Sequence, residues 1–477
     1  MIEGLCQRAP LVSTCVLDGD ELIAAQELAR DLTEDLATSW IPDVMANADL
    51  VEQLREPSLN RDDVDTVDVP KPGGGARTVP VLNGSALSAL RLAVQGAREQ
   101  SEFRLNPTVC GYRRGATGDV AYSEEYLRFR AIADGLSEQH RFVVQADIRN
   151  FFESVDIDIL GSLMTAQLGD AWWSIANFLA KTRKLGIRGL PAGYGDARLI
   201  ANLILTAADE SIGAAFTRWV DDYRIFVDSK PEADELLHKL SSVLAGFGME
   251  LNLDKLQVLD ADDYRARVHG PTLDSVYHPQ EEPPDVVRTN LRTVFLRAIS
   301  DGDRRMLRFS LPRLAQQRDD VAVTYVLWAL ERNAVDAPRM VHYLSFFLHD
   351  QAVVNGLEKI VMSNSLWPWT LIRLTPLLAR APLSSITVAA LAGLLHTADS
   401  PSLWGALLRV LSARGRISTV RDLLRDPAAV PDARASIAAC LDLGLAIPPE
   451  LGERAPKTFR AIEHLGQIPL PSAESQL

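Results

Sequence analysis

The chain has 477 residues, of which 47% are hydrophobic, and a formal net charge of −14 at pH 7. This length and composition allow two domains with substantial cores. Neither a signal peptide nor an apolar run long enough to span a bilayer is found, so we expect a cytoplasmic protein without membrane association. The four cysteines show neither metal-ligand nor disulfide spacing, which fits a reducing cytosol.

The negative charge is concentrated at the start of the chain. Residues 1–68 hold about 16 acidic and 4 basic side chains, so the remainder is near neutral and compatible with nucleic-acid binding. Basic residues such as Arg113, Arg128 and Arg183 are available to line a groove there. We assign residues 1–64 to an acidic helical N-terminal segment, whose amphipathic stretch would pack on another surface, in the same chain or in a second subunit.

A strand buried on both faces is predicted at residues 142–147, because its first five positions form a nearly continuous apolar run. Asp147 closes this strand, and an aspartate in that place is usually a cap for the next turn or a metal ligand. Residues 172–212 then read as a helix, a turn rich in Gly and Pro, and a second, strongly apolar helix.

Two adjacent carboxylates, Asp221 and Asp222, follow between short β-prone runs in residues 216–228. A solvated acidic turn is one explanation. However, adjacent carboxylates repel each other and a divalent cation resolves the conflict. A strand, a helical crossover and a hairpin suffice to bring Asp147 beside this pair in one sheet. Oxygen-only ligation suits Mg²⁺, with Mn²⁺ as the alternative, and two such ions meet the needs of nucleotidyl transfer.

These residues resemble the palm domain of reverse transcriptases, whose motifs occur here in the family's order. The matching segments are 147–152 (DIRNFF), 189–193 (GLPAG), 219–222 (WVDD) and 251–255 (LNLDK). Upstream, residues 67–81 are similar to the basic fingers hairpin and residues 106–115 to the family's GxRxG loop. The resemblance implies an α+β fold with right-hand-like palm and fingers, which we assign to residues 65–265.

The resemblance also implies roles for individual residues. It makes Asp147, Asp221 and Asp222 the catalytic, metal-binding triad, in which the second hairpin aspartate is often the less direct ligand. Phe152 matches the bulky residue beneath the sugar, which would clash with a 2′-hydroxyl and favour dNTPs over rNTPs. The alternative is that Phe151 and Phe152 are ordinary core aromatics, and we expect one of the pair to be so.

Further substrate-binding residues follow from the same resemblance. Lys71 and Arg77 match the fingers cations that hold the triphosphate, and both side chains suit phosphate. Lys255 matches a basic residue near the departing pyrophosphate, with a simple surface lysine as the rival interpretation. Ala192 and Gly193 belong to the turn at the incoming nucleotide. The family often has Gln at the position of Ala192, so its absence argues against strict template reading.

Departures from the common pattern indicate a subclass. Trp219 replaces the usual Tyr, and Arg218 stands just ahead of the aspartate hairpin. With the segment 194–213, these features resemble bacterial abortive-infection and defence-associated reverse transcriptases more than retroviral or intron enzymes. Several members of that group carry a helical repeat domain in place of a thumb or nuclease domain.

Helical apolar periodicity runs almost without interruption from about residue 285. Leu357 and Leu391 are 34 positions apart and Trp367 and Trp404 are 37 apart, spacings that fit helix-pair solenoids. We therefore assign residues 266–477 to an all-α, HEAT-like helical repeat domain. Its continuous apolar surfaces predict a homo-oligomer.

The sequence thus predicts an antiviral-defence DNA polymerase that uses dNTPs and a metal ion, with a protein-primed, non-templated DNA product suggested by the resemblance. Two alternatives stay open. One is a reverse transcriptase that copies a dedicated non-coding RNA. The other is a non-catalytic interaction scaffold with a degenerate palm, against which the intact aspartates argue.

Overall fold

A computed structural model describes residues 59, 61–71, 74–115, 118–119, 122–268, 283–363, 365–398, 400–456 and 459. The acidic amphipathic helix expected at residues 21–40 lies outside these ranges. The chain divides into two compact units: one is Leu90–Asp274, and the other combines the chain on either side of it. Among the described residues, no helix is long and apolar enough to cross a membrane.

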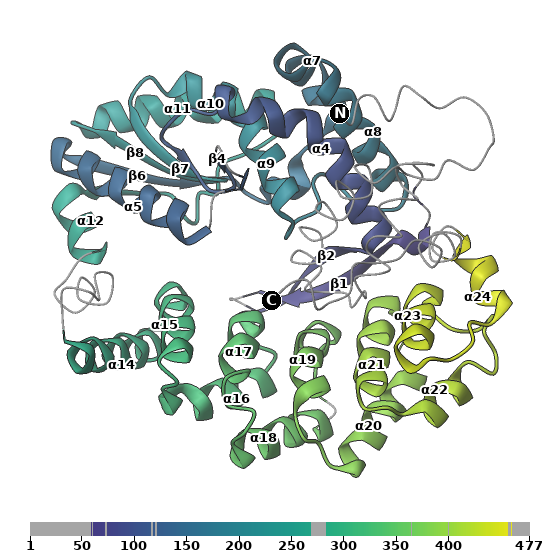
Figure 1. Ribbon diagram of the computed structural model, residues 1–477. Helices are drawn as coiled ribbons and strands as arrows, with labels where there is room; N and C mark the ends of the chain where they lie inside the picture. The colour runs from purple at the N-terminus through teal and green to yellow at the C-terminus, as the bar shows by residue number, and fades with distance from the viewer. Residues whose placement is uncertain are drawn as a thin grey trace. The chain divides into compact units, whose positions relative to one another are not determined.

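The unit Leu90–Asp274 is built on a five-stranded sheet with the strand order β3-β7-β8-β6-β9 (Figure 1). Its strands are β3 (Val109–Cys110), β6 (Phe142–Asp147), β7 (Ala215–Trp219), β8 (Asp222–Val227) and β9 (Gln257–Asp260). Neighbouring strands are antiparallel except for the parallel pair β3 and β7. The buried strand and the aspartate hairpin predicted from the sequence are β6 and the pair β7–β8; β9 was not predicted.

Helices cover this sheet and provide the crossover between β6 and β7. The helices are α4 (Gly84–Arg104), α5 (Tyr122–Gln139), α6 (Phe151–Ser154), α7 (Ile157–Leu168), α8 (Asp170–Lys184), α9 (Gly195–Ile204), α10 (Thr206–Ile212), α11 (Lys230–Gly246) and α12 (Ala261–Val268). A short ribbon, β4 (Arg114–Gly115) with β5 (Gly118–Asp119), completes the unit. The helix, turn and apolar helix expected over residues 172–212 are α8, the turn before α9, and α9 with α10.

A hydrophobic core fixes β6 and β8 against the helices. Val143 of β6 and Phe226 of β8 pack with Ala133 of α5 and Tyr264 of α12, and all four are buried. Both faces of β6 are covered, as its apolar run requires. Asp147 and Asp222 therefore stand on strands that the core holds firmly.

The other unit contains a β-hairpin and an all-helical C-terminal region. The hairpin joins β1 (Val64–Pro70) to β2 (Ala76–Leu82), and η1 (Arg61–Asp63) precedes it. The helical elements are α14 (Pro284–Asp301), α15 (Arg304–Gln316), η3 (Asp320–Ala322), α16 (Val323–Glu331), α17 (Ala337–Leu344), α18 (Gln351–Met362), α19 (Pro368–Arg380), α20 (Ser385–His396), α21 (Pro401–Ala413), α22 (Ile417–Leu423), α23 (Ala433–Leu443) and α24 (Pro449–Arg454).

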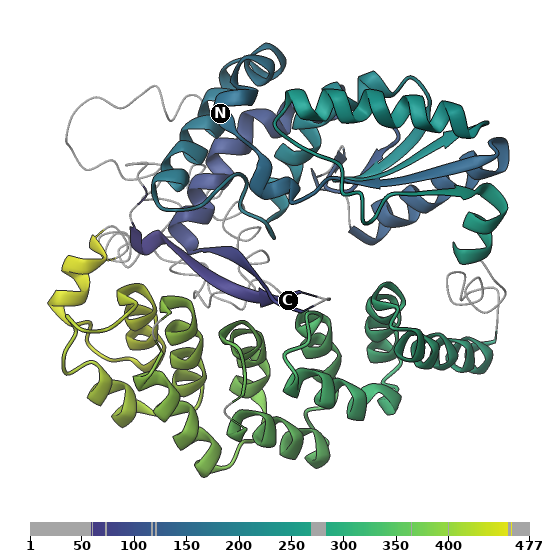
Figure 2. The same ribbon diagram turned by 180° about the vertical axis from the view of Figure 1, so that it is seen from behind.

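These helices alternate between two layers (Figures 1 and 2). In one layer α15, α17, α19, α21 and α23 contact one another in succession, and in the other α16, α18 and α20 do so. Pro338, Pro368 and Pro401 occupy the first turns of their helices, as expected for proline at helix starts. The all-α region is confirmed, and its assignment to HEAT-like repeats stays a prediction.

Candidate active site

The ends of β6 and β8 bring two of the predicted aspartates together. Asp147 is the last residue of β6 and Asp222 the first residue of β8, and the two are directly opposite in the antiparallel ladder. Directly opposed residues have their Cβ atoms about 4.5–5.5 Å apart and point to the same face of the sheet. The sequence prediction that these aspartates meet in one sheet is confirmed.

The turn between β7 and β8 is strained. Val220 has a φ of 58°, a value that a β-branched residue rarely adopts. Asp221 follows it directly, so the conformation of Val220 sets the position of this carboxylate. Such a conformation persists only when the surrounding structure holds it.

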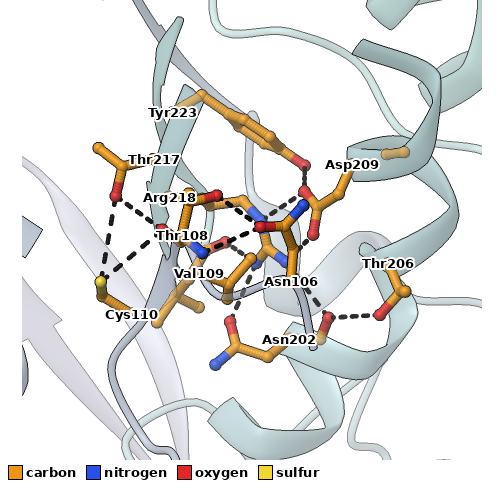
Figure 3. Close-up of polar contacts among 12 residues, drawn as sticks. Asn106, Thr108, Val109, Cys110, Asn202, Thr206, Asp209, Thr217, Arg218 and Tyr223 are labelled. Carbon is orange, nitrogen blue, oxygen red and sulfur yellow. Dashed lines mark hydrogen bonds and ion pairs between the residues drawn. The ribbon is translucent and has the colours of Figure 1, made fainter. Parts of the chain in front are cut away.

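Arg218 supplies that support from within the protein interior (Figure 3). Its guanidinium donates to the carbonyl oxygen of Val220 at 2.6 Å and to Oδ1 of Asn202 at 2.9 Å. It also forms a two-pronged ion pair with Asp209, in which Nε lies 2.8 Å from Oδ1. The Tyr223 hydroxyl donates to the same Oδ1 at 3.0 Å. Arg218 is fully buried and so ties the aspartate hairpin to helices α9 and α10.

Asp147 is held by the segment that the sequence matched to the LNxxK motif. The main-chain N–H of Asn252 donates to the carbonyl oxygen of Asp147 at 2.7 Å, and its Nδ2 donates to Oδ2 at 3.1 Å. Nζ of Lys255 lies 3.1 and 3.0 Å from the two carboxylate oxygens. Lys255 is therefore at the site as predicted, whereas Asn252 was missed although it lies within the quoted motif.

The two hairpin aspartates differ in their surroundings. Asp222 forms a two-pronged ion pair with Arg224, two residues further along β8. Burial and the neighbouring Asp147 carboxylate raise the pKa of Asp221 to about 6, and Asp222 adds to this effect. Asp222 thus has a directly bonded cation, whereas the charge of Lys255 only partly offsets the raised pKa of Asp221. That the second aspartate is the less direct ligand stays a prediction.

The aspartates of this site offer carboxylate oxygens, the ligands that a divalent cation such as Mg²⁺ prefers. No group of three or more His, Cys, Asp or Glu side chains within the described ranges is arranged to hold a metal ion. Asp147 and Asp221 nevertheless fit one, because both offer oxygen ligands and the raised pKa of Asp221 reports repulsion that a cation would relieve. These two residues would hold the cation. Lys255 bonds Asp147 as Arg224 bonds Asp222, so a cation at Asp147 would replace the exposed Lys255 there.

Phe151 and Phe152, the aromatic pair after Asp147, differ in burial, and one of them is a core residue as expected. Phe151 is buried in the core, and Phe152 is half-buried against it with ring centroids 5.5 Å apart. Gly189 lies so close to Phe152 that a Cβ there would come within 2.0 Å of its carbonyl oxygen. That same oxygen accepts a hydrogen bond from the N–H of Leu190 at 2.7 Å. The GLPAG turn therefore docks on the backbone of Phe152, which explains the glycine at position 189.

The remaining predicted substrate residues are placed as follows. In the GLPAG turn Ala192 is half-buried and Gly193 is exposed with a φ of 105°. Lys71 and Arg77 are exposed at the tip of the β1–β2 hairpin, within the other compact unit. The structure thus brings Asp147, Asp221, Asp222 and Lys255 into one site and carries the two fingers cations on a separate element.

The packing of Trp219 accounts for a glycine in the upstream loop, residues 106–115. Its indole packs against the rings of Tyr126, Phe129 and Tyr112, with centroid distances of 5.5, 6.0 and 6.3 Å. A Cβ at Gly111, whose φ is 85°, would come within 3.2 Å of the indole. The glycine of the segment GYRRG is therefore needed for close packing on the hairpin.

Several of the basic residues expected to line a groove also form contacts within the fold. Arg113 donates to the carbonyl oxygens of Asn106 and Val109 at 2.9 and 3.0 Å. Arg128 donates to Val109 at 3.1 Å, and Arg183 pairs with Asp158 at 2.8 Å. Hydrogen bonds to main-chain carbonyls thus occupy Arg113 and Arg128, and an exposed ion pair with a side-chain carboxylate occupies Arg183, contacts that the sequence did not reveal.

Comparison with known families agrees with this geometry. Residues 69–284 match the family model described as reverse transcriptase (RNA-dependent DNA polymerase). This part of the chain is a reverse transcriptase domain, the domain of an RNA-directed DNA polymerase-like nucleotidyltransferase. A search of curated proteins gave no match. The helices that follow residue 284 lie outside the matched region.

The raised pKa of Asp221 leads to a stability prediction. In the unfolded chain this carboxyl group titrates near its usual value of about 4, whereas in the folded protein it titrates near 6. Its ionisation therefore costs stability, and this cost grows as the pH rises from about 4 through about 6. Asp221→Asn should raise the free energy of unfolding of the metal-free protein by about 1–2 kcal/mol at pH 8.

Denaturant unfolding in the presence of a chelator, at pH 8 and pH 5, measures this effect. The gain at pH 5 should be about half of that at pH 8. Asp234→Asn is the control, because Asp234 is exposed on helix α11. An equal or larger gain at pH 5 would contradict the assigned pKa.

Proposed function

We propose that this protein is a metal-dependent DNA polymerase that transfers deoxynucleotides from dNTPs to a hydroxyl group, and that it acts in antiviral defence. The observation that carries the polymerase assignment is the pairing of Asp147 with Asp222 at the ends of β6 and β8, with Asp221 next in the hairpin and Lys255 bonded to Asp147. The defence role rests on the resemblance described above, together with the helical region that follows the reverse transcriptase domain.

Each residue has a distinct task in this proposal. Asp147 and Asp221 would supply carboxylate oxygens to hold a divalent cation. When bound, the cation stabilises the charge that develops as the α-phosphate is attacked. Lys255 can release Asp147 and turn to the departing pyrophosphate, because its side chain is 63% exposed. Lys71 would bind the triphosphate through its compact positive charge, and Arg77 through two parallel hydrogen bonds from its guanidinium.

The acceptor hydroxyl is either a nucleic-acid 3′-end or a protein side chain. We favour protein-primed, non-templated synthesis, since Ala192 stands where the family often has the Gln that contacts the template. The proposal also includes a homo-oligomer, with the helical region as the surface for assembly.

Incubation of the pure protein with each labelled dNTP and Mg²⁺ tests this function. Protein-primed synthesis predicts label that stays with the protein, is lost on protease treatment and forms without added template. Label that forms only with an added RNA would support the templated alternative. No incorporation under any of these conditions would support the non-catalytic scaffold.

Sugar selection gives a further prediction. Phe152→Val should raise the use of rNTPs relative to dNTPs by about tenfold or more, because a smaller side chain leaves room for the 2′-hydroxyl. The ratio of kcat/KM values for the two substrates measures this change. Phe151→Leu is the matched control: Phe151 lies in the core, so its replacement should lower stability and leave the ratio unaltered. An unchanged ratio in Phe152→Val would assign Phe152 to packing alone.

A further inference from the structure

The β1–β2 hairpin is anchored on the C-terminal helices. Val67 of β1 and Val81 of β2 are buried in one cluster with Trp369 and Ile372 of α19 and Ala406 of α21. The hairpin and these helices belong to the same compact unit. Residues more than 280 positions apart in the sequence therefore share one core.

A polar contact fixes the orientation of the hairpin on the helices. Oδ2 of Asp65 accepts hydrogen bonds from the Ser400 hydroxyl at 2.7 Å and from the N–H of Ser402 at 3.0 Å. Ser400 is the N-cap of α21, and its hydroxyl oxygen also accepts from the N–H of Leu403 at 3.3 Å. The carboxylate thus lies at the positive end of a helix and satisfies one of its free N–H groups.

The anchored part of the hairpin leads directly to its cations. Val67 and Lys71 are four residues apart, so about 13 Å of strand connects the buried cluster to the tip. Arg77 is opposite Val69, which packs at the edge of the cluster, and opposed residues share one face of a hairpin. A shift of one residue in the pairing of β2 with β1 would turn Arg77 to the other face of the hairpin.

We propose that the C-terminal helices position the nucleotide-binding hairpin, with Asp65, Ser400 and Trp369 as positioning residues for the dNTP. This inference rests on the proposed function, because it takes the ligand of Lys71 and Arg77 to be the triphosphate of that substrate. The helical region then serves substrate binding in each chain, in addition to any role in assembly. Its loss would impair polymerisation even though it lies outside the reverse transcriptase domain.

Asp65→Ala in the full-length protein tests this role with two independent measurements. Hydrogen exchange of peptides covering residues 64–82, without nucleotide, should become faster because the hairpin loses its polar anchor. The KM for dNTP should rise roughly tenfold with little change in kcat, because the hairpin that carries Lys71 and Arg77 loses hydrogen bonds to a charged group, each worth about that factor or more. Asp65→Asn keeps an acceptor oxygen and should restore much of the affinity.

Ser400→Ala and Ser384→Ala form a matched pair of controls. Both serines are helix N-caps that accept from a main-chain N–H at 3.3 Å, and Ser400 also contacts Asp65. Ser400→Ala should raise the KM for dNTP, whereas Ser384→Ala should leave it unchanged at a similar loss of stability. Equal KM values in both variants, or faster hairpin exchange with an unchanged KM in Asp65→Ala, would overturn the positioning role.

The two measurements also separate this inference from the proposed function. If the wild-type protein incorporates no dNTP, the polymerase assignment fails, while the exchange data still report whether Asp65 anchors the hairpin. If the wild type is active and Asp65→Ala matches it in both exchange and KM, only the anchoring role fails.

Discussion

Asn in place of Asp147 or Asp221 is expected to lower dNTP incorporation by about a hundredfold or more, because each change removes a ligand charge from the metal site. The fold should survive in both variants. Asp221→Asn relieves the repulsion that raises the pKa of this group. Asn at position 147 can still accept hydrogen bonds from Asn252. An inactive protein that is as stable as the wild type would therefore separate chemistry from folding.

Asp222→Asn provides the comparison within the same hairpin. Asp222 is paired with Arg224, so its replacement should reduce incorporation less than that of Asp221. Asp228→Asn, beyond the far end of β8, should leave activity unchanged. Wild-type incorporation by a well-folded Asp221→Asn protein would exclude Asp221 as a ligand and defeat the proposed chemistry.

Arg218→Met is expected to cost about 3–5 kcal/mol of stability, because it leaves the carboxylate of Asp209 buried without its cation. Asp209 and Arg218 are 2% and 0% exposed, so water cannot replace the lost partner. The carbonyl oxygen of Val220 also loses its donor at the strained turn. Incorporation should fall as well, since Asp221 follows Val220 directly.

Arg218→Lys sharpens this test. Lysine keeps the charge but cannot bond Asp209, Asn202 and Val220 at once, so it should recover part of the stability and little of the activity. Arg183→Met is the control, because Arg183 forms a solvent-exposed ion pair with Asp158 in the same compact unit. Denaturant unfolding and incorporation assays measure both effects. If Arg218→Met were as stable and active as Arg183→Met, the buried network would have no role in holding the hairpin.

The sequence predicted the palm well because its signals are local. The apolar run before Asp147 and the pair of short strands around Asp221 specify strands by composition alone. The pairing of these strands in one sheet was expected because the helical crossover between them is long enough to bring them together. The region of helical apolar periodicity after residue 285 likewise forms helices, because apolar residues at this spacing lie on one face of a helix and pack there.

What the sequence did not reveal depends on contacts between distant residues. Arg218 was noticed only as a departure from the common pattern, and its partners Asn202 and Asp209 lie on helices whose approach to the hairpin no local signal encodes. Asp65 was counted only among the acidic residues of the first 68, yet its carboxylate accepts a hydrogen bond from the N–H of Ser402 in the first turn of α21. The hydrogen bonds from Arg128 to main-chain carbonyls had no local signal either.

The central claim is that Asp147 and Asp221 hold a divalent cation. The most direct test is titration calorimetry of Mn²⁺ binding to the full-length protein in the presence of dNTP. If Asp147 and Asp221 together hold the cation, the wild type should bind it and both single Asn variants should lose most of that affinity. Asp228→Asn should bind like the wild type. Undiminished Mn²⁺ binding by Asp147→Asn and Asp221→Asn would contradict the assignment of this site.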